Sequence, residues 1–256
     1  MLEPVKSGFG GYMAGFYSYL VPTTKSMPEF IARGLPLSIV WATSGMVDKA
    51  EEMLATWQRN DTDSAATKPA KLPVIIVATA RDYMPTGRDF TRQIADSMPV
   101  IIPGDTIKGR LFGLRTIAGD IRAQVVVIAA DEPTARSIAS QFCLYMDTTS
   151  GRRFHANYTF AGVTDGWPVQ IESVDTPFVS VQTEIKNVVI LACDLTLKAT
   201  IPLFDAPKVG NANNDGKGIP ETVDPAGYAV VIEVDSVKPI GTTTDSLGSI
   251  NKIIAP

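Results

Sequence analysis

The segment closest to a phosphate-binding loop lies at residues 104–111 and reads Gly-Asp-Thr-Ile-Lys-Gly-Arg-Leu. A P-loop needs a lysine directly after its last glycine to reach the phosphates, followed by a hydroxyl that holds magnesium. Arg110 and Leu111 occupy those two positions here. Because both required groups are missing, we do not expect nucleotide chemistry at this segment.

Residues 211–221 imitate the beginning of a calcium-binding loop, because Asn211, Asn213 and Asp215 alternate before Gly216. The glutamate that closes such a loop falls at its twelfth position. Glu221 falls at the eleventh position, and the sequence indicates no flanking helix. We therefore interpret this stretch as a loop, and we expect no metal site there.

The chain has one histidine, His155, on the polar face of a predicted strand beside Arg153, Asn157 and Thr159. The members of a catalytic triad need only meet in space, so spacing alone does not decide the matter. However, no Gly-x-Ser-x-Gly turn or comparable Cys/His pattern accompanies this residue. We interpret His155 as a solvent-facing strand residue, and we expect a protein that is not an enzyme.

Cys143 and Cys193 are the only cysteines, and both lie among apolar neighbours. A structural zinc site needs four ligands, whereas one histidine and two cysteines supply three at most. We interpret the pair as small hydrophobic residues of a reducing compartment. No cofactor is expected.

The composition suits a protein with a sizeable core, since 45% of its 256 residues are hydrophobic. The net charge of −4 argues against broad binding of nucleic-acid phosphates. No stretch reaches the length of a membrane span, and the first residues do not resemble a signal peptide. We therefore expect a protein that is assembled inside a cell and has no membrane partner.

The clearest element is a strand at residues 187–204, in which apolar and polar residues alternate. Such a period of two predicts a sheet with one buried face and one face turned to water or to a partner. The predicted inward residues are Cys193, Leu195, Leu197, Ala199 and Ile201, and the outward residues are Asp194, Thr196, Lys198 and Thr200.

The remaining pattern predicts an α+β fold: a mixed, mostly antiparallel β-sheet flanked by two main α-helices, with long loops and an extended C-terminal tail. The helices are expected at residues 44–59 and 132–146, the second capped by Asp131. Further strands are expected at residues 37–42, 72–79, 110–116, 122–130, 154–160, 169–171, 178–182 and 228–237. A long excursion at residues 81–105 should hold one short helix at 89–97.

This order divides the chain into an α+β domain at residues 1–204, with an aromatic N-terminal segment, and a second part at 205–256. The second part contains a loop, one additional strand and the tail. The aromatic segment either packs on its own domain or inserts against a neighbour. As candidate subunit or partner contacts we select Phe9, Tyr12, Phe16, Tyr17, Tyr83, Met84, Ile250 and Ile253.

Several carboxylates gather on the predicted final strands, but they form no recognisable catalytic signature. Such a row is usually a solvated face of the sheet. In an oligomeric ring it could also line an acidic lumen. The candidate lumen residues are Glu172, Asp175, Glu184 and Asp194.

The order of elements resembles the tail terminator proteins of contractile-tailed bacteriophages, which are also called neck or gateway proteins. The resemblance is carried by the aromatic segment at residues 8–20, the strand at 72–79 with its excursion, the strand and helix at 124–146, and the long strand at 187–204. It covers residues 8–204 as a match of pattern and order. The loop and strand at 205–237 are not part of it.

The resemblance implies a structural virion protein that forms a homo-oligomeric, hexameric ring at the tail–neck junction after assembly in the host cytoplasm. The implied partners are further copies of the chain, tail tube and sheath proteins, and neck or head-completion proteins. Genomic DNA would pass through without specific binding. Two alternatives remain open, namely a ligand-binding module and another tail component such as a baseplate protein.

Overall fold

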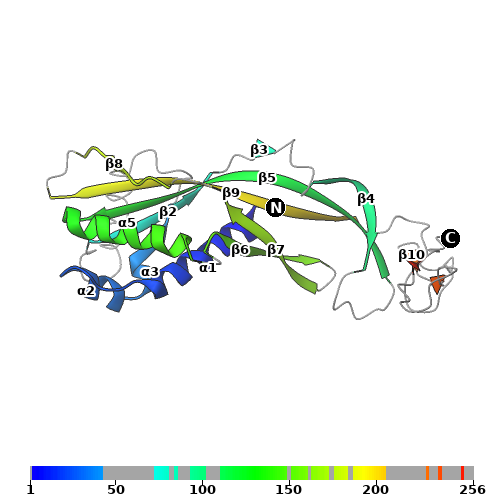
Figure 1. The fold of residues 1–256 in the computed structure, drawn as a ribbon, viewed down its shortest axis with the longest axis horizontal. Coiled ribbons are helices and arrows are strands. Elements are labelled where there is room, and N and C mark those ends of the chain that lie inside the picture. Colours follow the sequence, from blue (N-terminus) through cyan, green and yellow to red (C-terminus); the bar gives the residue numbers. More distant parts are fainter. Residues whose placement is uncertain are drawn as a thin grey trace, which may run out of the picture. The chain divides into compact units, whose positions relative to one another are not determined.

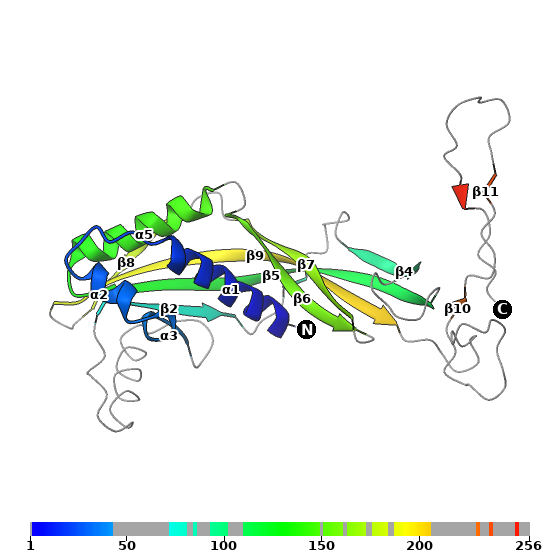
Figure 2. The same cartoon turned by 90° about the horizontal axis from the view of Figure 1, so that it is seen from below.

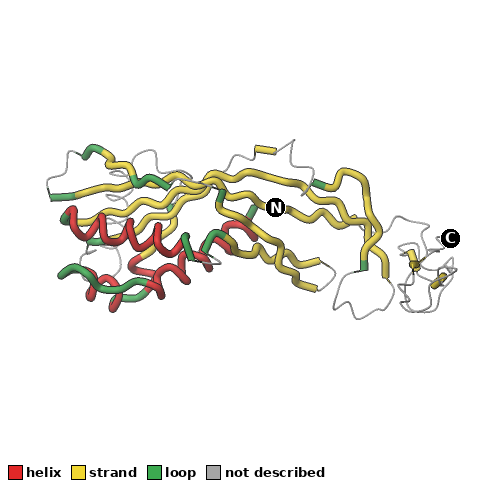
Figure 3. Tube along the Cα trace, in the orientation of Figure 1, coloured by secondary structure: helices red, strands yellow, loops and turns green. Residues whose placement is uncertain are grey.

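In the computed structural model the structure describes residues 2–42, 72–80, 84–85, 93–101, 110–148, 151–160, 163–172, 176–183 and 187–205, together with three short strands beyond residue 205 (Figure 3). The chain divides into two compact units. Unit 1 comprises Met1–Arg88, Ala118–Asn157 and Gly166–Thr200, and unit 2 comprises Asp89–Ile117, Tyr158–Asp165 and Ile201–Pro256.

The principal sheet has the strand order β1-β2-β5-β9-β7-β6 (Figure 1). Its strands are β1 (Ile39–Trp41), β2 (Val74–Thr79), β5 (Arg110–Ala129), β9 (Val189–Asp205), β7 (Val163–Ile171) and β6 (Arg153–Phe160). β1 and β2 are parallel, whereas β2 with β5 and β7 with β9 are antiparallel. The prediction of an α+β fold with a mixed, mostly antiparallel sheet is confirmed.

The strand β2 consists of Val-Ile-Ile-Val-Ala-Thr and is buried along almost its whole length. A continuous apolar run of this kind is typical of a strand that is covered on both faces. Val74 pairs with Ile128 and Ile76 with Val126 across the β2–β5 ladder. The predicted strand at 72–79 is confirmed.

The strand β5 is continuous, although the sequence predicted two strands separated near Gly119 and Asp120. Both residues pair with the short strand β3 (Met84–Pro85), which is antiparallel to β5 at this point. The ladder therefore keeps the backbone extended where a glycine beside an aspartate suggested a turn. The two predicted strands are corrected to one.

The alternation of β9 is confirmed, because Cys193, Leu195, Leu197, Ala199 and Ile201 are all buried. The other face of this strand was expected to turn to water or to a partner, and part of it is apolar and buried. A second apolar cluster lies on the face of the sheet that carries Asp194 and its partner Gln124. Its members lie an even number of residues from Asp194 on β9 or from Gln124 on β5, or pair with such positions from β2, so their side chains leave the sheet on the same side. Its buried members are Val74, Ile76, Ala78, Val126, Ile128 and Ile190.

The helices of unit 1 lie on one side of its sheet (Figures 1 and 2). They are α1 (Glu3–Tyr19), α2 (Met27–Ala32), α3 (Leu35–Ser38) and α5 (Glu132–Met146). The Asp131 side chain accepts a 2.8 Å hydrogen bond from the Thr134 amide at the N-terminus of α5, so this helix and its cap are confirmed. The predicted helix at 44–59 lies outside the described residues.

Aromatic side chains join α1 to α5. The Phe16 and Phe142 rings meet edge to face with centroids 5.0 Å apart, and both side chains are fully buried. A Cβ atom on Gly15 would lie 2.5 Å from the Tyr145 hydroxyl. Glycine at this position therefore allows the two helices to approach closely.

Unit 2 contains β4 (Ile94–Val100), which pairs antiparallel with residues 112–116 of β5. The sequence predicted a short helix at 89–97. That prediction is wrong for residues 94–97, which belong to strand β4. Ile94 donates its amide to the Thr116 hydroxyl at 2.9 Å, which joins β4 to β5 at the start of the strand. The Phe160 ring packs edge to face on Phe112 and parallel to Phe204.

Beyond residue 205 the structure describes only the backbone of β10 (Ala229–Val230), β11 (Ser236–Val237) and β12 (Ser249–Ile250). β10 pairs with β5, and β11 pairs with β12. The single strand predicted at 228–237 thus contains parts of two strands with different partners. Among the described residues, no helix combines the length and apolarity needed to cross a membrane.

Candidate functional site

A groove of about 450 Å³ lies in unit 1 between the first half of α1 and strand β6. We call it the α1/β6 groove. Helix α1 contributes Ser7, Gly8 and Gly11 to its lining. The polar lining on the strand side comes from Arg153, His155 and Asn157, and the aromatic lining from Tyr12, Tyr145 and Phe154.

Gly8 sets the spacing between α1 and β6. A Cβ atom at this position would lie 2.5 Å from the His155 carbonyl oxygen and 3.1 Å from the Phe154 ring. Because a backbone carbonyl cannot move aside easily, only glycine allows the helix to lie this close to the strand. Phe154 also contacts the Phe9 and Tyr12 rings, with centroids 6.0 and 5.6 Å apart.

Strand β6 alternates as predicted. Arg153, His155 and Asn157 are exposed, while Ala156 between them is buried. The prediction that His155 is a solvent-facing strand residue is confirmed. Its neighbours in the groove supply a cation and an amide, which bind anions and peptide groups.

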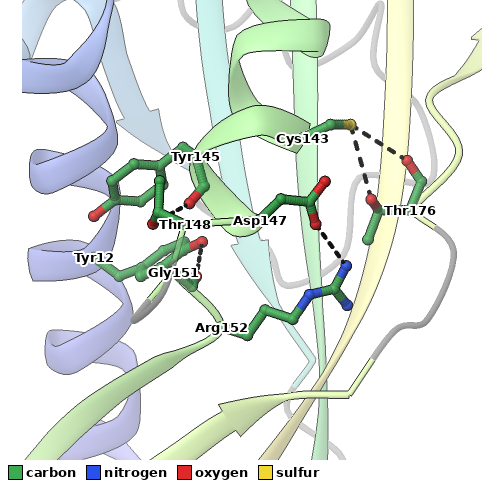
Figure 4. A network of polar contacts seen from close by, with 8 residues as sticks. All are labelled: Tyr12, Cys143, Tyr145, Asp147, Thr148, Gly151, Arg152 and Thr176. Atoms are coloured by element: carbon green, nitrogen blue, oxygen red, sulfur yellow. Dashed lines mark hydrogen bonds and ion pairs between the residues drawn. The ribbon is translucent and has the colours of Figure 1, made fainter.

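A polar network fixes the connection between α5 and β6 beside the groove (Figure 4). The Tyr12 hydroxyl donates to the Gly151 carbonyl oxygen at 2.6 Å, and Arg152 pairs with Asp147 at 3.2 Å. Burial raises the pKa of Tyr12, so its hydroxyl keeps its proton and acts as a donor. The network orients the first residues of β6.

Both cysteines are free thiols. Cys193 is buried, and burial raises the pKa of its thiol to about 12. Cys143 is half-buried and donates a weak hydrogen bond to the Thr176 carbonyl oxygen, with the sulfur 3.7 Å away. Reactive cysteines have a lowered pKa, so Cys193 is unsuited to nucleophilic chemistry.

The two candidate lumen carboxylates that the structure describes are paired with basic side chains. Glu172 contacts Lys198, and Asp194 lies 3.8 Å from Arg122 and accepts a 3.0 Å hydrogen bond from Gln124. This part of the sheet face is therefore mixed in charge. Asp175 and Glu184 lie outside the described residues.

The candidate contact residues of α1 make contacts within their own unit. Phe9, Tyr12 and Phe16 are buried in the core of their own unit, and Tyr17 donates its hydroxyl to the Ile31 carbonyl oxygen at 2.6 Å. The glycines of α1 bring these rings against the chain's own β6 and α5. Tyr83 and Ile253 lie outside the described residues, and only the backbone of Met84 and Ile250 is described.

The sequence reasoning missed the α1/β6 groove because it depends on contacts between residues more than a hundred positions apart. Arg153 and His155 were noticed only as neighbours on one strand. The glycines of α1 were the available signal, since a helix with repeated glycines needs a packing partner. Among the described residues, no cluster of three or more His, Cys, Asp or Glu side chains could hold a metal ion.

Comparison with known proteins adds no family to this description. No protein-family model matches the chain, and no curated protein matches it.

Proposed function

We propose that the protein is a structural virion subunit that forms a closed homo-oligomeric ring, a hexamer, which caps a phage tail tube and joins it to the head. In this proposal it is not an enzyme and uses no cofactor. Tail tube and sheath proteins bind on one side and neck proteins on the other. The acidic balance of the chain lets genomic DNA pass without being retained.

The observation that carries the proposal is the exposure of β4 in unit 2. All five central residues of this strand, 95–99, are exposed, so side chains on both of its faces are open. Met98 is 50% exposed, and Ile101 just after the strand is 54% exposed. Exposed strands with apolar residues are surfaces at which another chain adds to a sheet. A subunit that is completed by its neighbours presents such a strand.

The proposal includes the finer arrangement that the sequence predicts for the fold, with a second main helix at 44–59 and an extended C-terminal tail. The second apolar cluster supports the helix. This cluster lies on the sheet face opposite Cys193, whose buried thiol is influenced by Cys143 of α5. A buried apolar cluster on that face needs a covering layer of its own.

The test is self-association of the full chain, measured by sedimentation velocity over a wide range of concentrations and in the presence of tail tubes. The parent chain should form one closed species. Met98→Glu places a charge on exposed β4, so it should reduce assembly while leaving the circular dichroism spectrum unchanged. Ser140→Glu on the exposed part of α5 serves as the matched control. A parent chain that stays monomeric under both conditions contradicts the proposal.

A ligand-binding module is the second candidate, and the α1/β6 groove is the observation that favours it. Small-molecule sites enclose most of their ligand and are lined mainly by apolar groups. This groove instead has a polar side formed by Ser7, Arg153, His155 and Asn157. A monomeric protein that binds a small molecule in the groove would favour the second candidate.

A further inference from the structure

Gly11 is the one glycine in the lining of the α1/β6 groove whose residue type the chain's own packing does not explain. A Cβ atom at Gly8 would collide with the His155 carbonyl, and one at Gly15 would collide with the Tyr145 hydroxyl. A Cβ atom at Gly11 would meet nothing within 4 Å. Glycine inside a helix is destabilising relative to alanine, so this position gives up helix stability without any gain within the subunit.

A missing side chain on an exposed helix surface allows another backbone to approach closely. Gly11 lies in the lining of the groove, opposite the polar side chains of β6. The occupant is therefore expected to be a polypeptide whose backbone passes over α1 at this point.

The charge of the lining restricts the occupant further. Arg153 and His155 line the groove, and none of the described lining residues carries a carboxylate. Among the described residues Arg153 forms no ion pair. A guanidinium binds a carboxylate with two parallel hydrogen bonds, and Asn157 beside it can bind peptide groups. The segment that fits is an extended one carrying an aspartate or glutamate.

Strand β4 has these properties. Between the pairs Ile94–Thr116 and Met98–Leu114, four steps along β4 face two steps along β5. The extra residues form a bulge, which interrupts the ladder and turns side chains away from it. Asp96 lies in this bulge and is exposed, and the exposed Met98 lies two residues further along.

We propose that the α1/β6 groove binds strand β4 of a second copy of the chain, with Asp96 of that copy on Arg153 and its backbone against Gly11. The inference rests on the proposed self-assembly and names the surfaces that meet. Each subunit offers both surfaces, which gives the head-to-tail contact that a closed ring requires.

The test uses a fluorescent peptide of residues 93–101 and the full chain, at concentrations where the chain alone sediments as a monomer. Fluorescence anisotropy should show saturable binding to the parent. Gly11→Ala should weaken this binding about tenfold or more, because the new methyl group occupies the space of the peptide backbone. Gly10→Ala is the matched control on the same helix, since its Cβ would lie 3.6 Å from Trp41, an ordinary contact.

Charge exchange tests the ion pair separately. Arg153→Asp should abolish binding of the parent peptide, and the peptide carrying Asp96→Arg should bind this variant and not the parent chain. Binding that survives both Gly11→Ala and Arg153→Asp, or a parent chain that does not bind the peptide at all, overturns the inference. If the parent chain assembles into a ring but does not bind the peptide, only this inference fails. If the peptide binds as described but the chain never assembles, the ring proposal fails.

Discussion

The Tyr12 hydroxyl donates a 2.6 Å hydrogen bond to the carbonyl oxygen of Gly151, a residue 139 positions further along the chain. The bond joins α1 to the residues that begin β6, and both partners are buried. It therefore holds together the two elements between which the α1/β6 groove lies.

Changing Tyr12→Phe should lower the free energy of unfolding by about 1–3 kcal/mol, because the buried Gly151 carbonyl loses its donor. Urea denaturation followed by circular dichroism measures this difference. Tyr19→Phe is the control, since Tyr19 is 38% exposed. If both variants unfold at the same urea concentration as the parent, the hydrogen bond does not stabilise the fold.

Alanine substitutions at two glycines of α1 should act in opposite directions. Gly11→Ala should stabilise the isolated subunit by about 0.5–1 kcal/mol, because alanine favours the helix and the site is open. Gly8→Ala should destabilise it by about 1–3 kcal/mol, because the methyl group collides with the His155 carbonyl. Thermal unfolding of the two variants side by side tests the pair. A stabilising Gly8→Ala would contradict the described packing of α1 on β6.

The secondary-structure elements whose residues carry a clear periodicity or a helix cap could be predicted from the sequence. The alternation of apolar and polar residues in β9 indicates which of its faces is buried. Helix α5 begins at an aspartate cap and has a proline in its first turn. The same reasoning failed where a ladder with a distant strand decides the conformation. β4 was expected to be partly helical, yet it is held by Thr116 and its neighbours on β5.

The α1/β6 groove could not be predicted from the sequence, because it too depends on contacts between distant residues. The aromatic residues of α1 were recognised as one segment, but sequence alone left open whether they pack on their own domain or on a neighbour. The structure places Phe9, Tyr12 and Phe16 in the chain's own core. Of the two glycines that line the groove, Gly8 is required by the close approach to β6, whereas a Cβ atom at Gly11 would meet nothing within 4 Å. The sequence alone does not make that distinction.

Leu197→Asp should lower the free energy of unfolding by several kcal/mol, roughly 3 or more, because Leu197 is fully buried on the inward face of β9. Gln170→Asp on the neighbouring strand β7 is exposed and should unfold close to the parent. Differential scanning calorimetry compares the three proteins. A Leu197→Asp variant that melts like the parent would show that the inward face of β9 is assigned wrongly.

Stability should fall in alkali. Burial raises the pKa of Tyr158 to about 12, whereas an unfolded tyrosine titrates near 10. The folded state holds this proton more tightly, so its stabilising contribution is complete below pH about 10 and is lost as the pH rises towards 12. Tyr158→Phe should reduce this loss, and urea midpoints between pH 9 and 12 measure it. Equal slopes for parent and variant would contradict the assignment.

The most direct test of the proposed function is the position of this protein in assembled phage particles. Electron micrographs of virions labelled with antibodies against the chain should show label at the junction between tail and neck, and averaged images should show a ring there. Particles in which the protein is absent from this junction, or in which the label lies at the baseplate, would contradict the account.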